Sequence, residues 1–171
     1  SHIMNVLKRI KKQIVLGLVN SVFQGTHAFG IKRTLLNCCE GIQIGMGTKI
    51  VTPIHVPGVS SLEIGENCWI GRDFSLEGNG KVHIGSNCDL APAIVCVTGS
   101  HEIGDYNRRA GEGYNSGIGI GDGSWLGTRT IILPGIDIGK AVVIGAGSVV
   151  TKNLAEGSVY VGNPAKLMRK L

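Results

Sequence analysis

The sequence has 171 residues, enough for one domain with a core of its own. Its 27 glycines far exceed the average share of about 7%, and only 5% of the residues are aromatic although 43% are hydrophobic. The net charge of +5 is modest and no aromatic residues are interleaved with the basic ones, so we expect no nucleic-acid partner. No run of about 18 apolar residues predicts a membrane-spanning helix. A thin, aliphatic core with many turns is expected instead.

The first part of the chain is predicted to be helical. Residues 1–4 are interpreted as an expression scar followed by the start Met. Within residues 5–37, apolar residues recur near a helical period with lysines between them: Val6, Leu7, Ile10, Ile14, Leu18, Val22 and Phe23. We expect one or two amphipathic helices that cap the open end of the structure that follows. A basic amphipathic helix also suits a membrane surface, so weak contact with a membrane stays open.

A strict period of six governs the second half of the chain. Aliphatic residues recur at this interval, usually with Gly next and a small residue two positions before the following aliphatic: Ile120, Leu126, Ile132, Ile138, Ile144 and Val150. Helices repeat near 3.6 residues and strands near 2, so this period indicates short strands and turns used repeatedly, as in a solenoid. Since positions two apart on a strand share a face, the aliphatic and small residues are both expected to point inward.

The same hexad recurs upstream and is interrupted once. It is visible at Ile44, Ile64, Ile70 and Ile84, but it vanishes between Cys96 and Ile118. A solenoid can extrude a loop without losing its core, and such insertions often carry function. We therefore expect an extruded loop near residues 98–117 with a functional role.

This hexad resembles the left-handed parallel β-helix of the hexapeptide-repeat acyltransferases. The resemblance runs from about Ile64 to Leu171, and its most specific parts are Ile144-Gly-Ala-Gly-Ser-Val-Val-Thr-Lys152 and Gly162-Asn-Pro-Ala-Lys166. It implies an all-β solenoid with a left-handed parallel β-helix over residues 41–153. A C-terminal tail over residues 154–171, at the CoA end, is expected to hold a short strand and a brief basic helix that begins near Pro164.

The resemblance also implies the chemistry. Sugar O-acetyltransferases of the galactoside and maltose type, with their polysaccharide-modifying relatives, carry their catalytic histidine at the place of His101. An acceptor hydroxyl is a poor nucleophile until a base takes its proton, and neutral imidazole suits that task. By the same resemblance, the backbone N–H of Thr128 stabilises the oxyanion formed on the thioester carbonyl of acetyl-CoA.

Further expectations follow from the resemblance. The family implies a homotrimer with active sites between subunits, acetyl-CoA as the acyl donor and no metal. The cofactor-binding residues that it implies are Trp125, Gly127, Ala146, Thr151, Lys152, Lys166 and Arg169. Cations facing the CoA phosphates would explain the basic members of this set.

The acceptor site departs from the family pattern. The galactoside-type enzymes hold the acceptor sugar with an asparagine in the coil before the histidine, where this chain has Glu77. Either the acceptor differs from that of the galactoside-type enzymes, or Glu77 or Asn79 makes that contact. Other candidates for contact with a saccharide acceptor are Arg108, Arg109, Glu112 and Tyr114 in the extruded loop, and either Glu102 or Glu112 is a candidate to orient His101.

Other functions remain open on the sequence alone. An N-acetyltransferase for an amino-sugar nucleotide and a serine acetyltransferase share the β-helix and a histidine, whereas a γ-type carbonic anhydrase needs three histidines around a metal. A non-catalytic scaffold is a further alternative. Five cysteines, an odd number, with Cys68 and Cys88 at inward hexad positions, predict reduced thiols and a cytoplasmic location.

Overall fold

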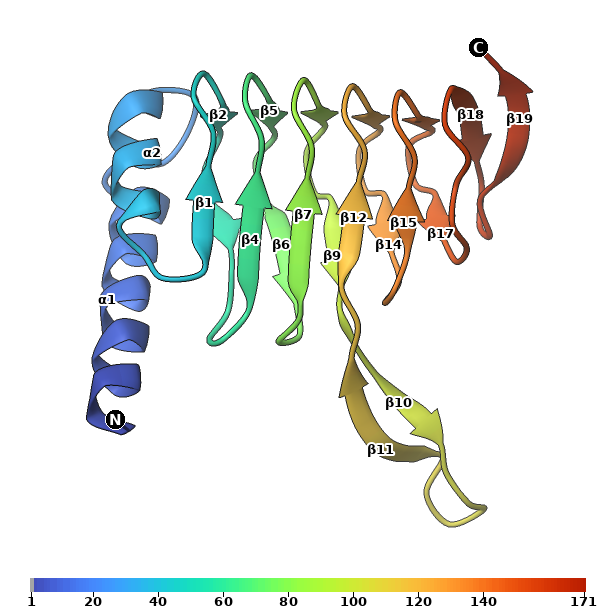
Figure 1. Cartoon of the computed structure of the whole chain (residues 1–171), viewed down its shortest axis with the longest axis horizontal. Coiled ribbons are helices and arrows are strands. Elements are labelled where there is room, and N and C mark those ends of the chain that lie inside the picture. Colours follow the sequence, from blue (N-terminus) through green and yellow to red (C-terminus); the bar gives the residue numbers. More distant parts are fainter. Residues whose placement is uncertain (1) are drawn as a thin grey trace.

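The computed structural model describes residues 2–171 and shows a left-handed parallel β-helix (Figure 1). Successive strands go in turn to three sheets, so each coil is triangular. Sheet 1 holds β1 (Ile42–Ile44), β4 (Ser61–Ile64), β7 (Lys81–Ile84), β12 (Ile118–Ile120) and β15 (Asp137–Ile138). Sheet 2 holds β2 (Lys49–Ile50), β5 (Trp69–Ile70), β8 (Asp89–Leu90), β13 (Trp125–Leu126), β16 (Val143–Ile144), β18 (Ser158–Val161) and β19 (Lys166–Lys170). Sheet 3 holds β3 (Ile54–His55), β6 (Phe74–Glu77), β9 (Val95–Val97), β14 (Ile131–Ile132) and β17 (Val149–Val150).

The hexad residues form the core, as the period of six predicts. The repeated aliphatic positions are at most 3% exposed from Ile120 to Val150. The small residues two positions earlier are buried with them, among them Ser124, Thr130 and Ser148. Their hydroxyl groups donate to backbone carbonyls, as Thr130 Oγ1 does to Gly127 O at 2.8 Å. Each inward polar group is thus satisfied inside the aliphatic prism.

Two corners of the triangular coils matter for function. The hairpin corner joins sheet 3 to sheet 1 and comprises residues 56–60, 78–80, 98–117, 133–136 and 151–153. The amide corner joins sheet 2 to sheet 3 and comprises residues 91–94, 127–130 and 145–148. The coils stack so closely there that a Cβ added to Gly127 would lie 2.5 Å from Ala146 N, which explains why glycine follows the aliphatic residue.

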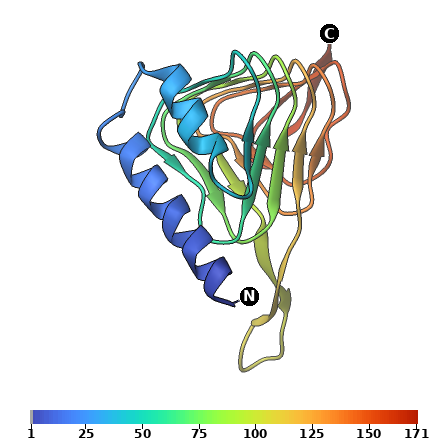
Figure 2. The same ribbon diagram turned by 60° about the vertical axis from the view of Figure 1, so that its left-hand side comes forward.

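Two helices, α1 (His2–Asn20) and α2 (Phe29–Asn37), lie at the β1 end of the stack (Figures 1 and 2). A capping helix normally buries its apolar face. Here α1 instead buries Val15, Val19 and Lys12, whereas most apolar residues in the helical pattern, from Val6 to Val22, stay exposed. The side chain of Asn20 fixes this orientation, since it both donates to Ile54 O and accepts from Ile54 N–H.

The C-terminal tail contains no helix among its residues, so the expected basic helix near Pro164 is wrong. Residues 162–165 form a turn, and β19 then pairs antiparallel with β18. A helix of one or two turns is marginal in water, whereas β19 obtains backbone partners from an existing sheet edge. The basic residues Lys166 and Arg169 consequently lie on a strand.

The five cysteines are all unpaired. Cys68 and Cys88 are buried at the inward positions that the hexad predicts, and Cys38 is exposed. Complete burial raises the pKa of Cys96 to about 12, because the thiolate would lose its hydration. The cytoplasmic location stays a prediction. Neither α1 nor α2 is both long and apolar enough to cross a lipid bilayer.

Candidate active site

The extruded segment is a β-hairpin anchored at the hairpin corner. Strands β10 (Gly99–Ile103) and β11 (Ala110–Asn115) pair antiparallel and project away from the prism (Figure 1). Thr98 is fully buried at the base, where its hydroxyl donates to Glu77 O at 2.8 Å and accepts from Gly80 N–H at 3.0 Å. The Asn115 side chain accepts from Asn79 N–H at 2.8 Å. These bonds hold the hairpin against the coil below.

His101 lies on β10 and is oriented by the backbone of β11. Its Nδ1 is 2.9 Å from Gly111 O, which can only accept a hydrogen bond. Neutral imidazole therefore carries its proton on Nδ1 and keeps a lone pair on Nε2, for which the described residues offer no partner. Gly113 stands opposite, where an added Cβ would come within 3.4 Å of the imidazole. This arrangement presents an unoccupied basic nitrogen.

Neither carboxylate proposed to orient His101 does so in this chain. Glu102 and Glu112 are exposed and make no hydrogen bond to the imidazole. The backbone carbonyl of Gly111 orients the imidazole instead. Glu102 follows His101 directly on β10, so its side chain points to the opposite face of the strand, whereas the backbone of β11 lies beside the imidazole. The sequence signal for such a partner is weak, since any residue supplies a carbonyl.

Two cavities flank His101, and their lining shows which of the proposed acceptor residues lie beside it. A cavity of about 450 Å³ brings His101 together with Asn79 and Tyr114, and also with Ser100 and Asn115, which the sequence reasoning did not single out. A second cavity, of about 520 Å³, joins His101 with Arg108. Antiparallel pairing across the hairpin, had it been predicted, would have placed Ser100 opposite Tyr114.

The remaining acceptor candidates lie elsewhere. The Glu77 carboxylate is 4.0 Å from His55 Nε2 and accepts a hydrogen bond from Ser75, so it faces sheet 3 and not the hairpin. The Arg109 guanidinium lies 5.7 Å from the Tyr106 ring centre, near the hairpin tip. Of the two candidates for the asparagine contact, Asn79 is the one beside His101.

The amide corner presents unused backbone donors. The N–H groups of Gly127 and Arg129 donate to Ile144 O and Pro92 O, but that of Thr128 between them has no acceptor among residues 2–171. One coil further along the stack, Ala146 N–H is likewise unused in the described chain. The Thr128 hydroxyl donates to Pro92 O at 2.7 Å. Thr128 and Ala146 thus form a short ladder of free amide donors.

The other proposed cofactor residues lie around this corner and beyond it. Trp125 is 58% exposed on sheet 2, between Asp89 and Val143 of the neighbouring coils. Lys166 and Arg169 are exposed on β19 at the edge of the same sheet. Thr151 and Lys152 follow β17 at the hairpin corner instead, so the structure does not gather all the proposed CoA ligands on one face.

His101 and Thr128 are on different corners of the same prism. Sheet 3 separates the two corners, because each of its strands runs from the amide corner to the hairpin corner. One chain therefore holds the basic nitrogen and the free amide donors apart. Among residues 2–171, no group of three or more His, Cys, Asp or Glu side chains is arranged to hold a metal ion.

Comparison with known proteins shows the family of this chain. A family model described as bacterial transferase hexapeptide (six repeats) matches residues 117–152, and one described as hexapeptide repeat of succinyl-transferase matches residues 62–92. A putative acetyltransferase of Saccharomyces cerevisiae is 37% identical over 139 residues, covering 81% of this chain and 68% of the yeast protein. The chain belongs to the hexapeptide-repeat acetyltransferases.

Solved structures support the same family. A maltose O-acetyltransferase from Clostridium difficile is 30% identical, with a TM-score of 0.76 over 98% of this chain and 88% of that one. A galactoside acetyltransferase in complex with coenzyme A is 25% identical, with a TM-score of 0.80 over 97% of this chain and 82% of that one. Other curated acetyltransferases are longer, and this chain spans 56% to 63% of their length. The solved galactoside enzyme thus binds coenzyme A on the same fold, and this chain is an acyltransferase of that hexapeptide-repeat family.

Proposed function

We propose that this acetyltransferase moves the acetyl group of acetyl-CoA to a hydroxyl of a saccharide, with His101 as the general base. The observation that carries the proposal is the hydrogen bond from His101 Nδ1 to Gly111 O. It leaves Nε2 with a lone pair beside a cavity that is lined by Asn79 and Tyr114. The similarity to a maltose O-acetyltransferase and a galactoside acetyltransferase supports a saccharide acceptor.

The reaction needs one proton acceptor and one oxyanion site. The acceptor oxygen attacks the thioester carbonyl carbon while its proton passes to His101 Nε2. The carbonyl oxygen becomes an oxyanion, which the free N–H of Thr128 stabilises. When the intermediate collapses, the C–S bond breaks, the ester remains on the sugar and the imidazolium returns the proton to the sulfur of CoA.

Acceptor and donor are held by different parts of the chain in this proposal. Asn79, Tyr114 and Arg108 line the cavities on either side of His101 and contact the saccharide. The pantetheine arm lies along the amide corner, near Gly127, Ala146 and Trp125. Four further residues contact the phosphates and the adenine end of CoA: Thr151, Lys152, Lys166 and Arg169.

A homotrimer completes the site. The amide corner and the hairpin corner lie on opposite edges of sheet 3, so one chain alone cannot bring Thr128 to His101. A neighbouring prism in a closed ring supplies the missing half, with His101 from one subunit and Thr128 from the next. Light scattering that finds a monomer under assay conditions would contradict this arrangement.

The acceptor class is tested by thiol release from acetyl-CoA over a panel of compounds. The panel contains galactosides, maltose and acidic sugars, with free amino sugars and serine as amine and amino-acid alternatives. We expect turnover above the acceptor-free rate only with sugar hydroxyls, and an alkali-labile ester in the product. An alkali-stable amide, or turnover with serine alone, would exclude O-acetylation of a saccharide.

The divided site also predicts complementation between inactive variants. Oligomers that mix His101→Ala chains with Thr128→Pro chains contain some sites with both native halves. Each mixed trimer holds one site of three with both native halves, so purified mixed trimers regain about a third of the parental activity, whereas an unfractionated random mixture regains about a quarter. Coexpression with two distinct affinity tags isolates the mixed oligomers for assay. If each site lay within one chain, the mixed oligomers would stay as inactive as either variant alone.

A further inference from the structure

The outer surface of α1 carries an apolar stripe that packs against nothing in the chain. We define the stripe as Leu7, Ile10, Ile14 and Leu18, which are 59%, 45%, 59% and 40% exposed. Residues three and four apart on a helix share a face, so these side chains form one continuous line. Val6, 41% exposed, extends its edge. The most apolar face of α1 therefore points away from the prism.

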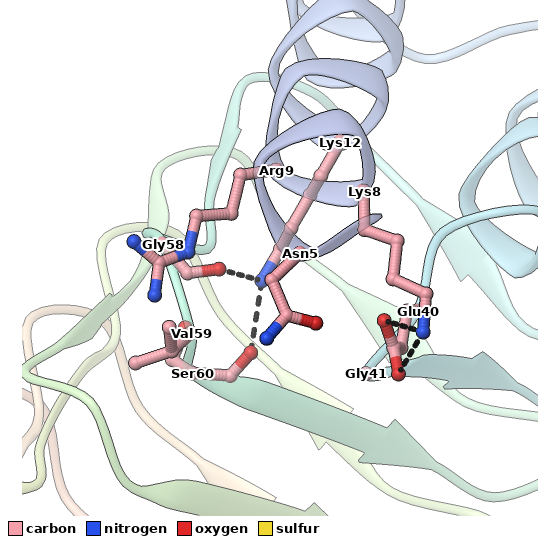
Figure 3. Close-up of a pocket in the computed structure, with 9 residues that line it drawn as sticks. All are labelled: Asn5, Lys8, Arg9, Lys12, Glu40, Gly41, Gly58, Val59 and Ser60. Carbon is pink, nitrogen blue, oxygen red and sulfur yellow. Dashed lines mark hydrogen bonds and ion pairs between the residues drawn. The ribbon is translucent and has the colours of Figure 1, made fainter. Parts of the chain in front are cut away.

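The inner face of α1 holds a buried lysine beside Val15 and Val19, where a core face would normally be wholly apolar. Lys12 is only 4% exposed, and its Nζ donates to Gly58 O at 3.2 Å and to Ser60 O at 2.8 Å (Figure 3). Burial lowers the pKa of Lys12, because desolvation disfavours the ammonium. The helix thus buries a lysine and leaves the four aliphatic side chains of the stripe in water. Packing within the chain does not explain this orientation, so the stripe has an external partner.

The charges of α1 indicate what that partner is. The helix has four basic residues, Lys8, Arg9, Lys11 and Lys12, and no acidic residue. Lys11 borders the stripe, being one position from Ile10 and four from Leu7. Of these four residues, Lys8 alone forms an ion pair within residues 2–171, with Glu40 at 2.9 Å. If α1 of another chain packed directly against this helix, the cations of the two helices would repel one another, whereas an anionic surface complements them.

We propose that the stripe of α1 inserts into an anionic lipid surface, with the helix lying in the plane of the interface. An amphipathic helix of this kind buries its apolar face at the boundary of headgroups and acyl chains and places its lysines among anionic headgroups. The hairpin and the N-terminal half of α1 extend to the same side of the prism (Figures 1 and 2). This inference does not depend on the identity of the acceptor.

Sedimentation of the full chain with vesicles tests the proposal. We expect binding to phosphatidylcholine vesicles that contain phosphatidylglycerol, and little binding to phosphatidylcholine alone. The double variant Ile10→Gln, Ile14→Gln should bind at least about tenfold more weakly, because it removes the centre of the inserted face. Lys11→Gln should weaken binding about fivefold at low salt and less at high salt. Glutamine keeps good helix propensity, so the helix should persist in both variants.

Matched controls separate insertion from other roles of α1. Ile31→Gln changes an equally apolar residue, 52% exposed on α2 and outside the stripe, and should leave vesicle binding unchanged. Acetyl transfer to a soluble acceptor should be the same in the stripe variants as in the parent chain. Equal binding to both vesicle types, or no binding by the parent chain, overturns the proposal. A stripe variant that changes the oligomeric state in light scattering without altering sedimentation would show that a second copy covers the stripe. If circular dichroism shows that the double variant is unfolded, the vesicle binding of Lys11→Gln and its dependence on salt test the proposal instead.

Discussion

Replacement of His101 by Ala is expected to lower kcat by about 10²–10⁴-fold, the usual contribution of a positioned general base. The change removes the nitrogen that accepts the hydroxyl proton, while β10 keeps its pairing with β11, because the ladder is made by backbone groups. The Michaelis constant for acetyl-CoA should change little, since His101 is not among the residues proposed to bind the cofactor. Steady-state thiol release with a responsive sugar provides the measurement.

His83→Ala is the matched control for this variant. His83 is also exposed on a strand, but its Nδ1 lies 3.7 Å from the Glu63 carboxylate on sheet 1, away from the hairpin cavities. The adjacent Lys81 ammonium, 2.9 Å away, lowers the pKa of that carboxyl through a hydrogen bond and its charge. The control should keep parental activity within a few-fold. A His101→Ala enzyme that matched the control would remove His101 from the mechanism.

Replacement of Thr128 by Pro is expected to lower kcat by about 10²–10³-fold, the loss typical of one missing oxyanion donor. Proline deletes the amide N–H, and the fold should tolerate it, because Pro92 occupies the equivalent position of the coil below. The register makes them equivalent, since Leu126 pairs with Leu90, two residues earlier in each coil. Activity and melting temperature, measured on the same preparation, separate catalysis from folding.

Thr128→Ala distinguishes the amide from the hydroxyl. Alanine keeps the N–H and removes only the hydroxyl that donates to Pro92 O. The loss of one such hydrogen bond should destabilise the chain by about 1 kcal/mol and leave kcat within about tenfold of the parent. If the alanine and proline variants were equally inactive, the side chain and not the amide would be the important group.

The sequence predicted the prism well, because the period of six is imposed by geometry. An aliphatic residue, a tight corner and a small inward residue must recur wherever one coil stacks on the next, as Leu126 and Thr130 illustrate. The packing face of α1 was not predictable in the same way. It depends on three backbone carbonyls that accept from Lys12, and carbonyls leave no trace in a pattern of side chains.

The site was predicted in its parts more than in its arrangement. His101 was marked by the place where the repeat stops, and the structure adds the carbonyl that orients it. Asn79 and Glu77 were equivalent candidates in the sequence, but they separate because the chain turns between them and Glu77 ends β6 facing His55. The helix predicted near Pro164 was wrong for a related reason. The segment forms β19 instead, and its pairing with β18 depends on an open sheet edge that only the complete stack provides.

Insertion of the hairpin has little effect on the thermodynamics of the stack. Asn67 and Asn87, hydrogen-bonded across neighbouring coils, are 20 residues apart, while Ser86 and Asp122, which flank the insertion, are 36 apart. Closing the longer loop costs about 0.5 kcal/mol more, since loop entropy grows only with the logarithm of length. Selection can therefore lengthen, shorten or replace the segment that carries His101 without endangering the scaffold. The loop around His101 is free to diverge between relatives while the amide corner stays the same.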